Sequence, residues 1–115
     1  MIVPLLFSHS SDDGFIRRKL AMSYKRIVFS GHAVRRMFNR GLTKNGIMAV
    51  IEHGEIIIDY PDDNPYPCSL ILGYIKDAPV HVVLAIDTQK QTAIVVTAYV
   101  PDAKLWSDDF KTRRK

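Results

Sequence analysis

Residues 30–41 read SGHAVRRMFNRG, and this stretch combines a helix start, a helical periodicity and a helix end. Ser30 is a residue type that caps helix N-termini, and Gly41 stands where a left-handed residue commonly closes a helix. At about 100° per residue, apolar and polar side chains fall on opposite sides. The apolar side comprises Ala33, Val34, Met37 and Phe38, and the polar side comprises His32, Arg35, Arg36, Asn39 and Arg40. The sequence therefore predicts a helix at residues 31–40 with a buried stripe and a cationic face.

A second helix is predicted directly after the first. Thr43 is a suitable N-cap, and a second periodic stretch runs through His53 and ends at Gly54. His53 lies in the last turn, where a cation suits the helix dipole, so we interpret it as a structural residue. The stripe that we expect to be buried comprises Ile47, Met48, Val50 and Ile51.

After Gly54 the pattern changes from helical to extended. The last three β-rich runs are joined by short segments and should form an antiparallel meander, whereas the three prolines of residues 61–67 predict a loop. We therefore expect an α+β fold in which two N-terminal helices pack on one face of a four-stranded, mainly antiparallel sheet. The other sheet face is left available for function. The four predicted strands are residues 55–60, 69–75, 80–87 and 92–100.

The composition fits one small domain. The chain has 115 residues, of which 47% are hydrophobic and 24% are charged, values typical of a globular protein. We expect residues 22–115 to form this domain and residues 1–21 to be an N-terminal extension, with Met22 as an alternative start. Met1–Phe7 is apolar but lacks a preceding basic region, and no apolar run approaches the roughly 18 residues of a membrane span. The lone Cys68 favours a reducing compartment, so we expect the cytoplasm.

Charge is distributed unevenly along the chain. Residues 22–51 carry six basic side chains and no acidic one, residues 52–109 carry three basic and ten acidic ones, and the C-terminus is basic again. Such asymmetry favours a polyanion as the ligand of the basic part. The alternative is that these are solvated faces that only confer solubility. The side chains that we expect to bind nucleic acid are Arg35, Arg40, Lys44, Arg113 and Arg114.

His32 lies in the middle of the polar helix face, one turn before Arg36 and two turns before Arg40. This position does not suit a packing residue. An imidazole beside guanidinium groups is the combination required of a general base that acts on a ribose 2′-hydroxyl next to a phosphate. The alternative interpretation is an ordinary surface histidine. His32 and Arg36 are therefore candidate catalytic residues.

A second candidate pair lies in the predicted sheet. In the run at residues 80–87, alternation directs His81 away from the helices. In the next run, the same alternation assigns Ile94 and Val96 to the core and Tyr99 to the open face. The pair can be neighbours only if paired residue numbers sum to an even value, which requires a three- or five-residue connection or a bulge. The alternative is a half-buried histidine and tyrosine at a sheet edge.

The sequence lacks the common metal and cofactor motifs. It has no H-E-x-x-H, no histidine pair four residues apart, no paired cysteines and no glycine-rich phosphate loop. Asp59, Asp62 and Asp63 cluster near the prolines, but the prolines disrupt an EF-hand spacing, so we interpret this segment as a solvated loop. We therefore expect neither a metal nor a cofactor.

Six short motifs carry a family resemblance. They are HAVRRMFNRG at residues 32–41, GEII at 54–57, YPDDNPYP at 60–67, LILG at 70–73, HVV at 81–83 and YVPD at 99–102. Trp106, in the polar tail, and a basic C-terminal end follow the last motif. In this order, over roughly residues 26–115, they resemble a bacterial family labelled domain of unknown function 4258. The first motif is similar to the family's opening pattern H-A-x-x-R-M-x-x-R-G. The extension at residues 1–21 lies outside the pattern.

The resemblance implies a fold and a partner. The family looks like a branch of the RelE-like toxins, in which a small sheet packed by N-terminal helices cleaves RNA without a metal. Its members are often encoded beside a small zinc-finger antitoxin resembling that of the MqsR-type system, which implies a protein partner. The positions that match the family's pattern are His32, Arg36, Arg40, His81 and Tyr99.

These observations lead to a functional hypothesis: the toxin of a type II toxin–antitoxin system, acting as a metal-independent endoribonuclease. Either His32 or His81 would take the 2′-proton and the other would protonate the leaving oxygen, helped by Tyr99, while Arg36 and Arg40 stabilise the phosphorane. Expected partners are RNA, free or on the ribosome, and the antitoxin. The alternative is a non-catalytic module that binds nucleic acid or protein. Helices on one sheet face reach the other face only at an edge, so the hypothesis requires these residues to meet there.

Overall fold

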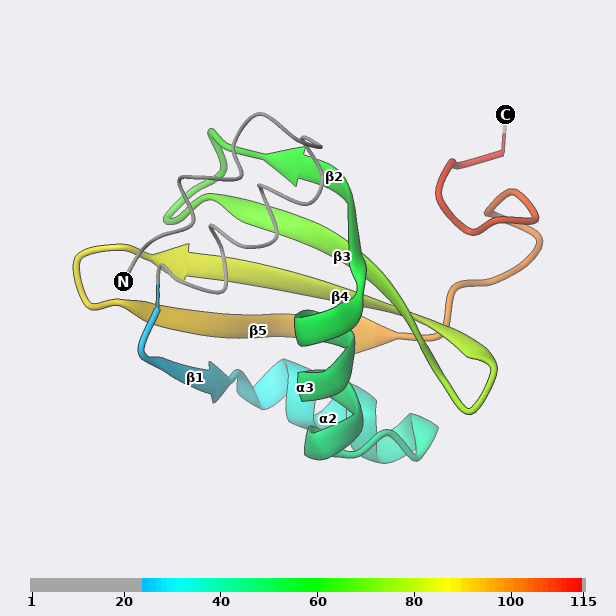
Figure 1. Cartoon of the computed structure of the whole chain (residues 1–115), viewed down its shortest axis with the longest axis horizontal. Helices are drawn as coiled ribbons and strands as arrows, with labels where there is room; N and C mark the ends of the chain where they lie inside the picture. The colour runs from blue at the N-terminus through cyan, green and yellow to red at the C-terminus, as the bar shows by residue number, and fades with distance from the viewer. Residues whose placement is uncertain (1–23, 115) are drawn as a thin grey trace.

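The computed structural model describes residues 24–114, which form one sheet and two helices (Figure 1). The predicted extension, residues 1–21, lies outside these residues. Both predicted helices are confirmed, and the four predicted strands are present to within two residues at each end. In chain order the elements are β1 (Arg26–Phe29), α2 (Gly31–Arg40), α3 (Lys44–His53), β2 (Glu55–Tyr60), β3 (Cys68–Ile75), β4 (Ala78–Asp87) and β5 (Thr92–Tyr99).

The sheet differs from the prediction. It has five strands in the order β1-β5-β4-β3-β2, and β1 pairs in parallel with β5, so the predicted four-stranded, mainly antiparallel sheet is wrong. The missed strand, β1, has only four residues and is separated from α2 by Ser30 alone. Four residues are too few for alternation to distinguish a strand from a loop. The protein is α+β, with a mixed sheet.

Local capping explains why both helices begin where the sequence predicts. The Ser30 hydroxyl accepts a hydrogen bond from the Ala33 amide at 3.0 Å, and Thr43 makes the same contact with the Gly46 amide. Gly41 closes α2 with a φ of 68°. The Ser30 hydroxyl also donates to the Val96 carbonyl at 2.9 Å, which fixes the start of α2 against β5.

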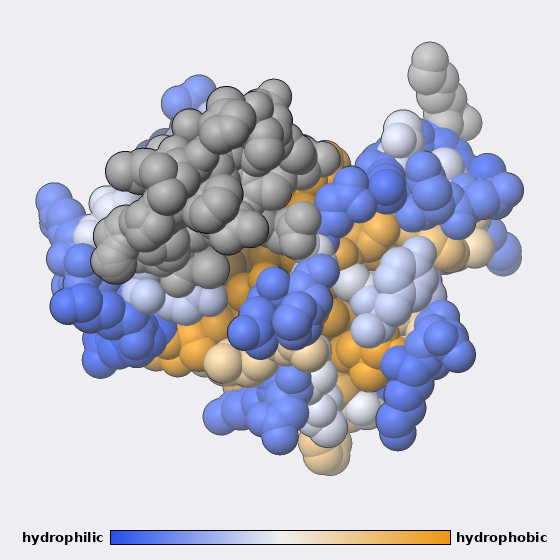
Figure 2. Space-filling model, in the orientation of Figure 1, coloured by the Kyte–Doolittle hydropathy of each residue, from blue (hydrophilic) through white to orange (hydrophobic). Residues whose placement is uncertain are grey.

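Both helices pack on the same face of the sheet and form the core with it. α2 packs mainly against β5 and buries only Ala33 and Met37. Val34 and Phe38 of α2 and Met48 of α3, which periodicity assigned to the buried stripes, are exposed. In the space-filling view, apolar and hydrophilic side chains alternate over the lower part of the molecule, where the helices lie (Figure 2). Among residues 24–114, no helix is long and apolar enough to cross a membrane.

A β-bulge sets the register between β4 and β5. Val83 pairs with Thr97 and Leu84 pairs with Val95, so Val96 is the extra residue. Before the bulge, Ala93 and Val95 face the core, and the prediction that Ile94 and Val96 do so is wrong. One inserted residue reverses which residues face the core, so the predicted alternation fails before Val96 and holds after it, where Ala98 faces the core.

Gly54 joins α3 directly to β2 and leaves no space for a side chain. A Cβ at this position would meet the carbonyl oxygen of Val50 and, at 2.7 Å, that of Leu72. Because both neighbours are backbone atoms, we expect Gly54→Ala to destabilise the protein by about 1–3 kcal/mol in urea denaturation. Gly31→Ala is the matched control, since nothing lies within 4 Å of a Cβ there. Equal destabilisation by the two variants would contradict this interpretation.

Candidate active site

His81 lies at the centre of the sheet, on the face opposite the helices. Its neighbours across β4 are Leu72 on β3 and Tyr99 on β5, so the predicted pairing with Tyr99 is confirmed. The connection between the strands has four residues, 88–91, which alone would not make His81 and Tyr99 partners. The extra residue at the bulge shifts the register by one and brings them opposite each other. The His81 side chain is 0% exposed, which is deeper than the half-buried alternative.

The C-terminal tail, residues 100–114, covers His81. The Trp106 ring meets the imidazole edge to face, with ring centroids 4.4 Å apart. The Phe110 carbonyl oxygen lies 2.8 Å from Nε2 of His81. Trp106 is itself buried. The open sheet face that the sequence predicts is therefore occupied by the tail at this position.

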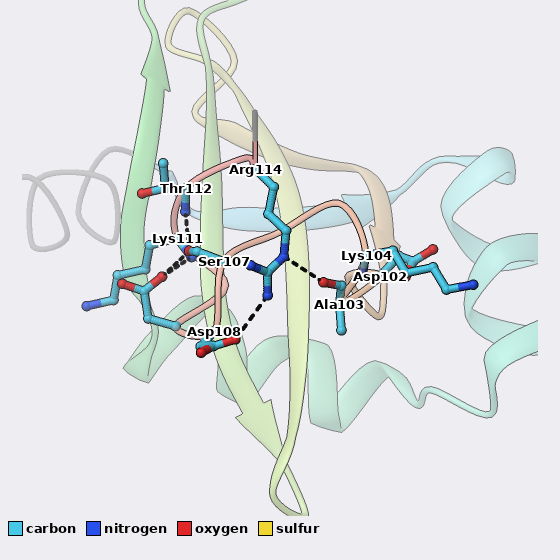
Figure 3. Close-up of polar contacts among 9 residues, drawn as sticks. Asp102, Ala103, Lys104, Ser107, Asp108, Lys111, Thr112 and Arg114 are labelled. Carbon is cyan, nitrogen blue, oxygen red and sulfur yellow. Dashed lines mark hydrogen bonds and ion pairs between the residues drawn. The ribbon is translucent and has the colours of Figure 1, made fainter.

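Hydrogen bonds within the tail hold it in shape (Figure 3). The Arg114 guanidinium donates to the Ala103 carbonyl at 2.9 Å and to the Asp108 carboxylate at 3.0 Å. The backbone amide of Ser107 donates to the Thr112 carbonyl at 2.8 Å. Lys111 forms an ion pair with Glu55 of β2 at 3.1 Å. The tail is therefore a compact turn anchored to the sheet.

The hydrogen bonds of His81 define its tautomer. A carbonyl oxygen only accepts, so Nε2 of His81 carries the proton and donates to Phe110. Nδ1 is then an acceptor, and the Tyr99 hydroxyl, 3.3 Å away, donates to it. Burial lowers the pKa of His81, although the Phe110 carbonyl partly opposes this shift. The imidazole is therefore neutral at neutral pH and accepts a hydrogen bond from the Tyr99 hydroxyl.

Tyr99 is half-buried and lies between the buried His81 and the cationic side chains Arg36 and Arg113. Burial and the Tyr60 phenol raise the pKa of Tyr99, whereas the charges of Arg113 and Arg36 oppose the increase. The Arg36 guanidinium carbon lies 5.9 Å from the centroid of the Tyr99 ring. Nε of Arg36 is buried and has no hydrogen-bond partner among the described residues. The guanidinium instead packs beside the Tyr99 ring.

The short β1 explains how a helix residue reaches the far face of the sheet. β1 pairs only with Thr92–Val95, so within the described residues Thr97–Tyr99 of β5 have a strand partner on the β4 side alone. Arg36 passes over Tyr99 at this edge. The hypothesis from the sequence requires helix and sheet residues to meet at an edge of the sheet. Arg36, Tyr99 and His81 do so, since Tyr99 contacts both of the others.

The other predicted site residues surround this cluster less closely. His32, Arg35 and Arg40 are exposed on α2, and the structure gives no contact from His32 to His81 or Tyr99. Lys44 lies 5.4 Å from the Phe29 ring centroid. Arg113 lies 5.5 Å from the Trp106 ring centroid. Arg114 binds within the tail, as described above. The structure thus unites three of the four predicted catalytic residues and leaves His32 apart.

Two residues in the site were not assigned a role from the sequence. From the sequence, Trp106 is placed in the polar tail and in the family resemblance without a role, and Phe110 contributes a backbone carbonyl that no side-chain pattern encodes. A buried tryptophan in a polar segment was the available signal, because large aromatic side chains in such segments commonly pack onto a neighbouring surface.

A separate pocket of about 570 Å³ lies between α3, β3 and the tail. Leu72, Tyr74 and Lys111 help to line it, whereas Arg36, His81 and Tyr99 do not. Arg36 and Tyr99 are half-buried and Arg113 is exposed, so the cluster around Tyr99 reaches the surface, where an extended polymer can contact it. Within residues 24–114, no three His, Cys, Asp or Glu side chains are grouped so that they could hold a metal ion.

The buried histidine predicts a pH-dependent stability. Because folding lowers the pKa of His81, the unfolded chain binds more protons than the folded chain at mildly acidic pH. Stability should therefore fall as the pH decreases below about 6.5, the usual pKa of histidine. Urea denaturation between pH 5 and 8 measures this effect. His81→Gln should flatten the profile, His32→Gln should not, and identical profiles for all three proteins would refute the assignment.

The fold and the site define a class of small α+β protein in which a histidine buried in the sheet supports a surface tyrosine beside an arginine. A family model described as Domain of unknown function (DUF4258) matches residues 29–100, and the chain belongs to this family. The family resemblance of the sequence motifs is thereby confirmed. No curated protein and no solved structure matches the chain, so the RelE-like relationship receives no support from these comparisons. The match ends at Val100, the first residue of the tail, and does not include Trp106 or Phe110, which contact His81.

Proposed function

We propose that this protein is an endoribonuclease that cleaves RNA without a metal, at the surface formed by Arg36 and Tyr99. The observation that carries the proposal is the hydrogen bond from the Tyr99 hydroxyl to Nδ1 of the buried His81, beside the Arg36 guanidinium. This arrangement offers a proton relay next to a cation. Proton removal and charge neutralisation are what 2′-hydroxyl attack on a phosphate requires.

In the proposed reaction, Tyr99 and His81 remove the proton of the 2′-hydroxyl. Tyr99 takes the proton of the 2′-hydroxyl and passes its own proton to Nδ1 of His81, which becomes an imidazolium. The Phe110 carbonyl accepts from Nε2 and stabilises that cation, consistent with its effect on the pKa of His81. The 2′-oxygen bonds to phosphorus, and the bond from phosphorus to the 5′-oxygen breaks. His32 contacts neither Tyr99 nor His81, but it lies one turn from Arg36 on the exposed side of α2, and we propose it as the donor of the proton that the 5′-oxygen takes up.

Cationic side chains supply the remaining contacts. Arg36 neutralises charge on the phosphorane oxygens, and Arg113, whose charge also acts on Tyr99, contributes from the tail. Arg35, Arg40 and Lys44 are exposed and bind flanking phosphates. This part of the affinity is independent of sequence and should decrease steeply with salt.

The biological role proposed is that of a cytoplasmic toxin in a type II toxin–antitoxin pair. Its substrate is RNA, free or on the ribosome, and its partner is a cognate antitoxin, with a small zinc-finger protein as the expected type. This part of the proposal rests on the family resemblance together with the cationic surface of α2.

The direct test is incubation of end-labelled RNA with the purified protein in EDTA, with and without ribosomes. We expect cleavage by the wild type and about a 100-fold slower rate for Arg36→Ala, because the charge-neutralising group is lost. His32→Ala tests the proton donor. Leu105→Ala is the control, since this side chain is exposed in the tail and takes no part in the mechanism. Intact RNA in every reaction would refute the enzymatic proposal.

A binding module without catalysis is the second candidate. The complete burial of His81 favours a binding module, because a buried imidazole with both nitrogens hydrogen-bonded can stabilise the fold without taking part in a reaction. This candidate predicts RNA binding in a gel-shift assay that Arg36→Ala abolishes, with no cleavage products. Cleavage that depends on Tyr99 would exclude it.

A further inference from the structure

Two apolar side chains project from α2 into solvent. Val34 is 45% exposed and Phe38 is 84% exposed, although both belong to the helix that covers the core. They are four residues apart and therefore adjacent on one side of the helix. We call this pair the α2 apolar ridge. Large exposed apolar groups on a small protein commonly mark a contact with another macromolecule.

The α2 apolar ridge is separate from the proposed cleavage site at Arg36 and Tyr99. At about 100° per residue, Phe38 and Arg36 differ by about 200° around the helix axis, so they project from opposite flanks. Arg36 approaches Tyr99, as described above, and Ala33 and Met37 face the core between the two flanks. A ligand on the ridge therefore does not compete directly for Arg36.

The charges around the ridge select the kind of ligand. α2 contains no acidic residue, and Arg35 follows Val34 directly on the exposed surface. A second copy meeting this surface through its own ridge would bring like charges together. An acidic partner gains attraction from the same cations.

We propose that the α2 apolar ridge is a docking surface for an amphipathic, acidic helix of a partner protein. Phe38 is the aromatic anchor, and apolar residues of the partner at i and i+4 spacing pack on it and on Val34. Carboxylates that flank this apolar stripe pair with Arg35. The proposal does not depend on RNA cleavage, because it uses neither Tyr99 nor His81.

Binding of a designed peptide tests the proposal. The probe is a fluorescent helical peptide of about 15 residues with leucine at helical spacing and glutamate elsewhere. We expect fluorescence anisotropy to show saturable binding that Phe38→Ala weakens about tenfold or more. Arg35→Glu should weaken binding as well. The control variant Leu105→Ala, which removes another exposed apolar side chain, should bind as the wild type does.

Three further measurements separate the alternatives. A peptide with lysine in place of every glutamate should not bind, and equal binding would overturn the charge argument. Sedimentation should give a monomer for both the wild type and Phe38→Ala, whereas a dimer lost in Phe38→Ala would assign the ridge to a second copy. Binding of an oligoribonucleotide should be unchanged in Phe38→Ala, and RNA binding that Phe38→Ala weakens as strongly as it weakens peptide binding would assign the ridge to RNA.

Discussion

Tyr99→Phe is expected to reduce the rate of RNA cleavage about 100-fold or more while leaving RNA affinity nearly unchanged. The variant removes only the hydroxyl that donates to Nδ1 of His81, so the ring remains beneath Arg36. Phosphate binding by the guanidinium is retained, but the path for the 2′-proton is lost. Single-turnover cleavage of a labelled RNA gives the rate, and fluorescence anisotropy gives the affinity.

The control for this experiment is another tyrosine in the same sheet. Tyr74 on β3 is 57% exposed, and Tyr74→Phe also deletes one phenolic hydroxyl. It should cleave RNA at the wild-type rate. A Tyr99→Phe variant as active as Tyr74→Phe would show that the relay plays no part in the reaction.

Trp106→Ala is expected to destabilise the protein by about 3–5 kcal/mol in urea denaturation. Trp106 is buried and packs edge to face against the imidazole of His81, so its removal leaves a cavity above the sheet. Release of the tail would also expose His81 to water and return its pKa toward the ordinary value. NMR titration of the imidazole measures that second effect.

Leu105→Ala provides the matched comparison for the tail. Leu105 precedes Trp106 but is 48% exposed, so its truncation should change the stability by only about 0.5 kcal/mol. If both variants unfold at the same urea concentration, the tail does not contribute to the fold through Trp106. An unchanged His81 titration in Trp106→Ala would lead to the same conclusion.

Local signals explain the parts of the fold that the sequence predicts. Ser30, Thr43 and Gly41 act within one turn of their own helices, and the caps occur where expected. Alternation also places His81 and Tyr99 on the same face, because no irregularity lies between the bulge at Val96 and Tyr99. The required bulge was one of the stated conditions, but its position at Val96 depends on the pairing with β4.

The missed features depend on contacts between distant segments. β1 is a strand because β5 pairs with it, about 65 residues further along the chain. The burial of His81 depends on Trp106 and Phe110, which reach it through turns in the tail. Phe38 was predicted to be buried but is exposed, since helical periodicity predicts an apolar side of the helix but not how much of that side the sheet covers.

The measurement that tests the central claim most directly is end-group analysis of RNA incubated with the purified protein in EDTA. Attack by the 2′-hydroxyl, driven by Tyr99 and His81, predicts fragments with 2′,3′-cyclic phosphate and 5′-hydroxyl ends. It also predicts that Tyr99→Phe yields almost none of them. Fragments with 5′-phosphate ends, or RNA that stays intact at every protein concentration, would contradict the account.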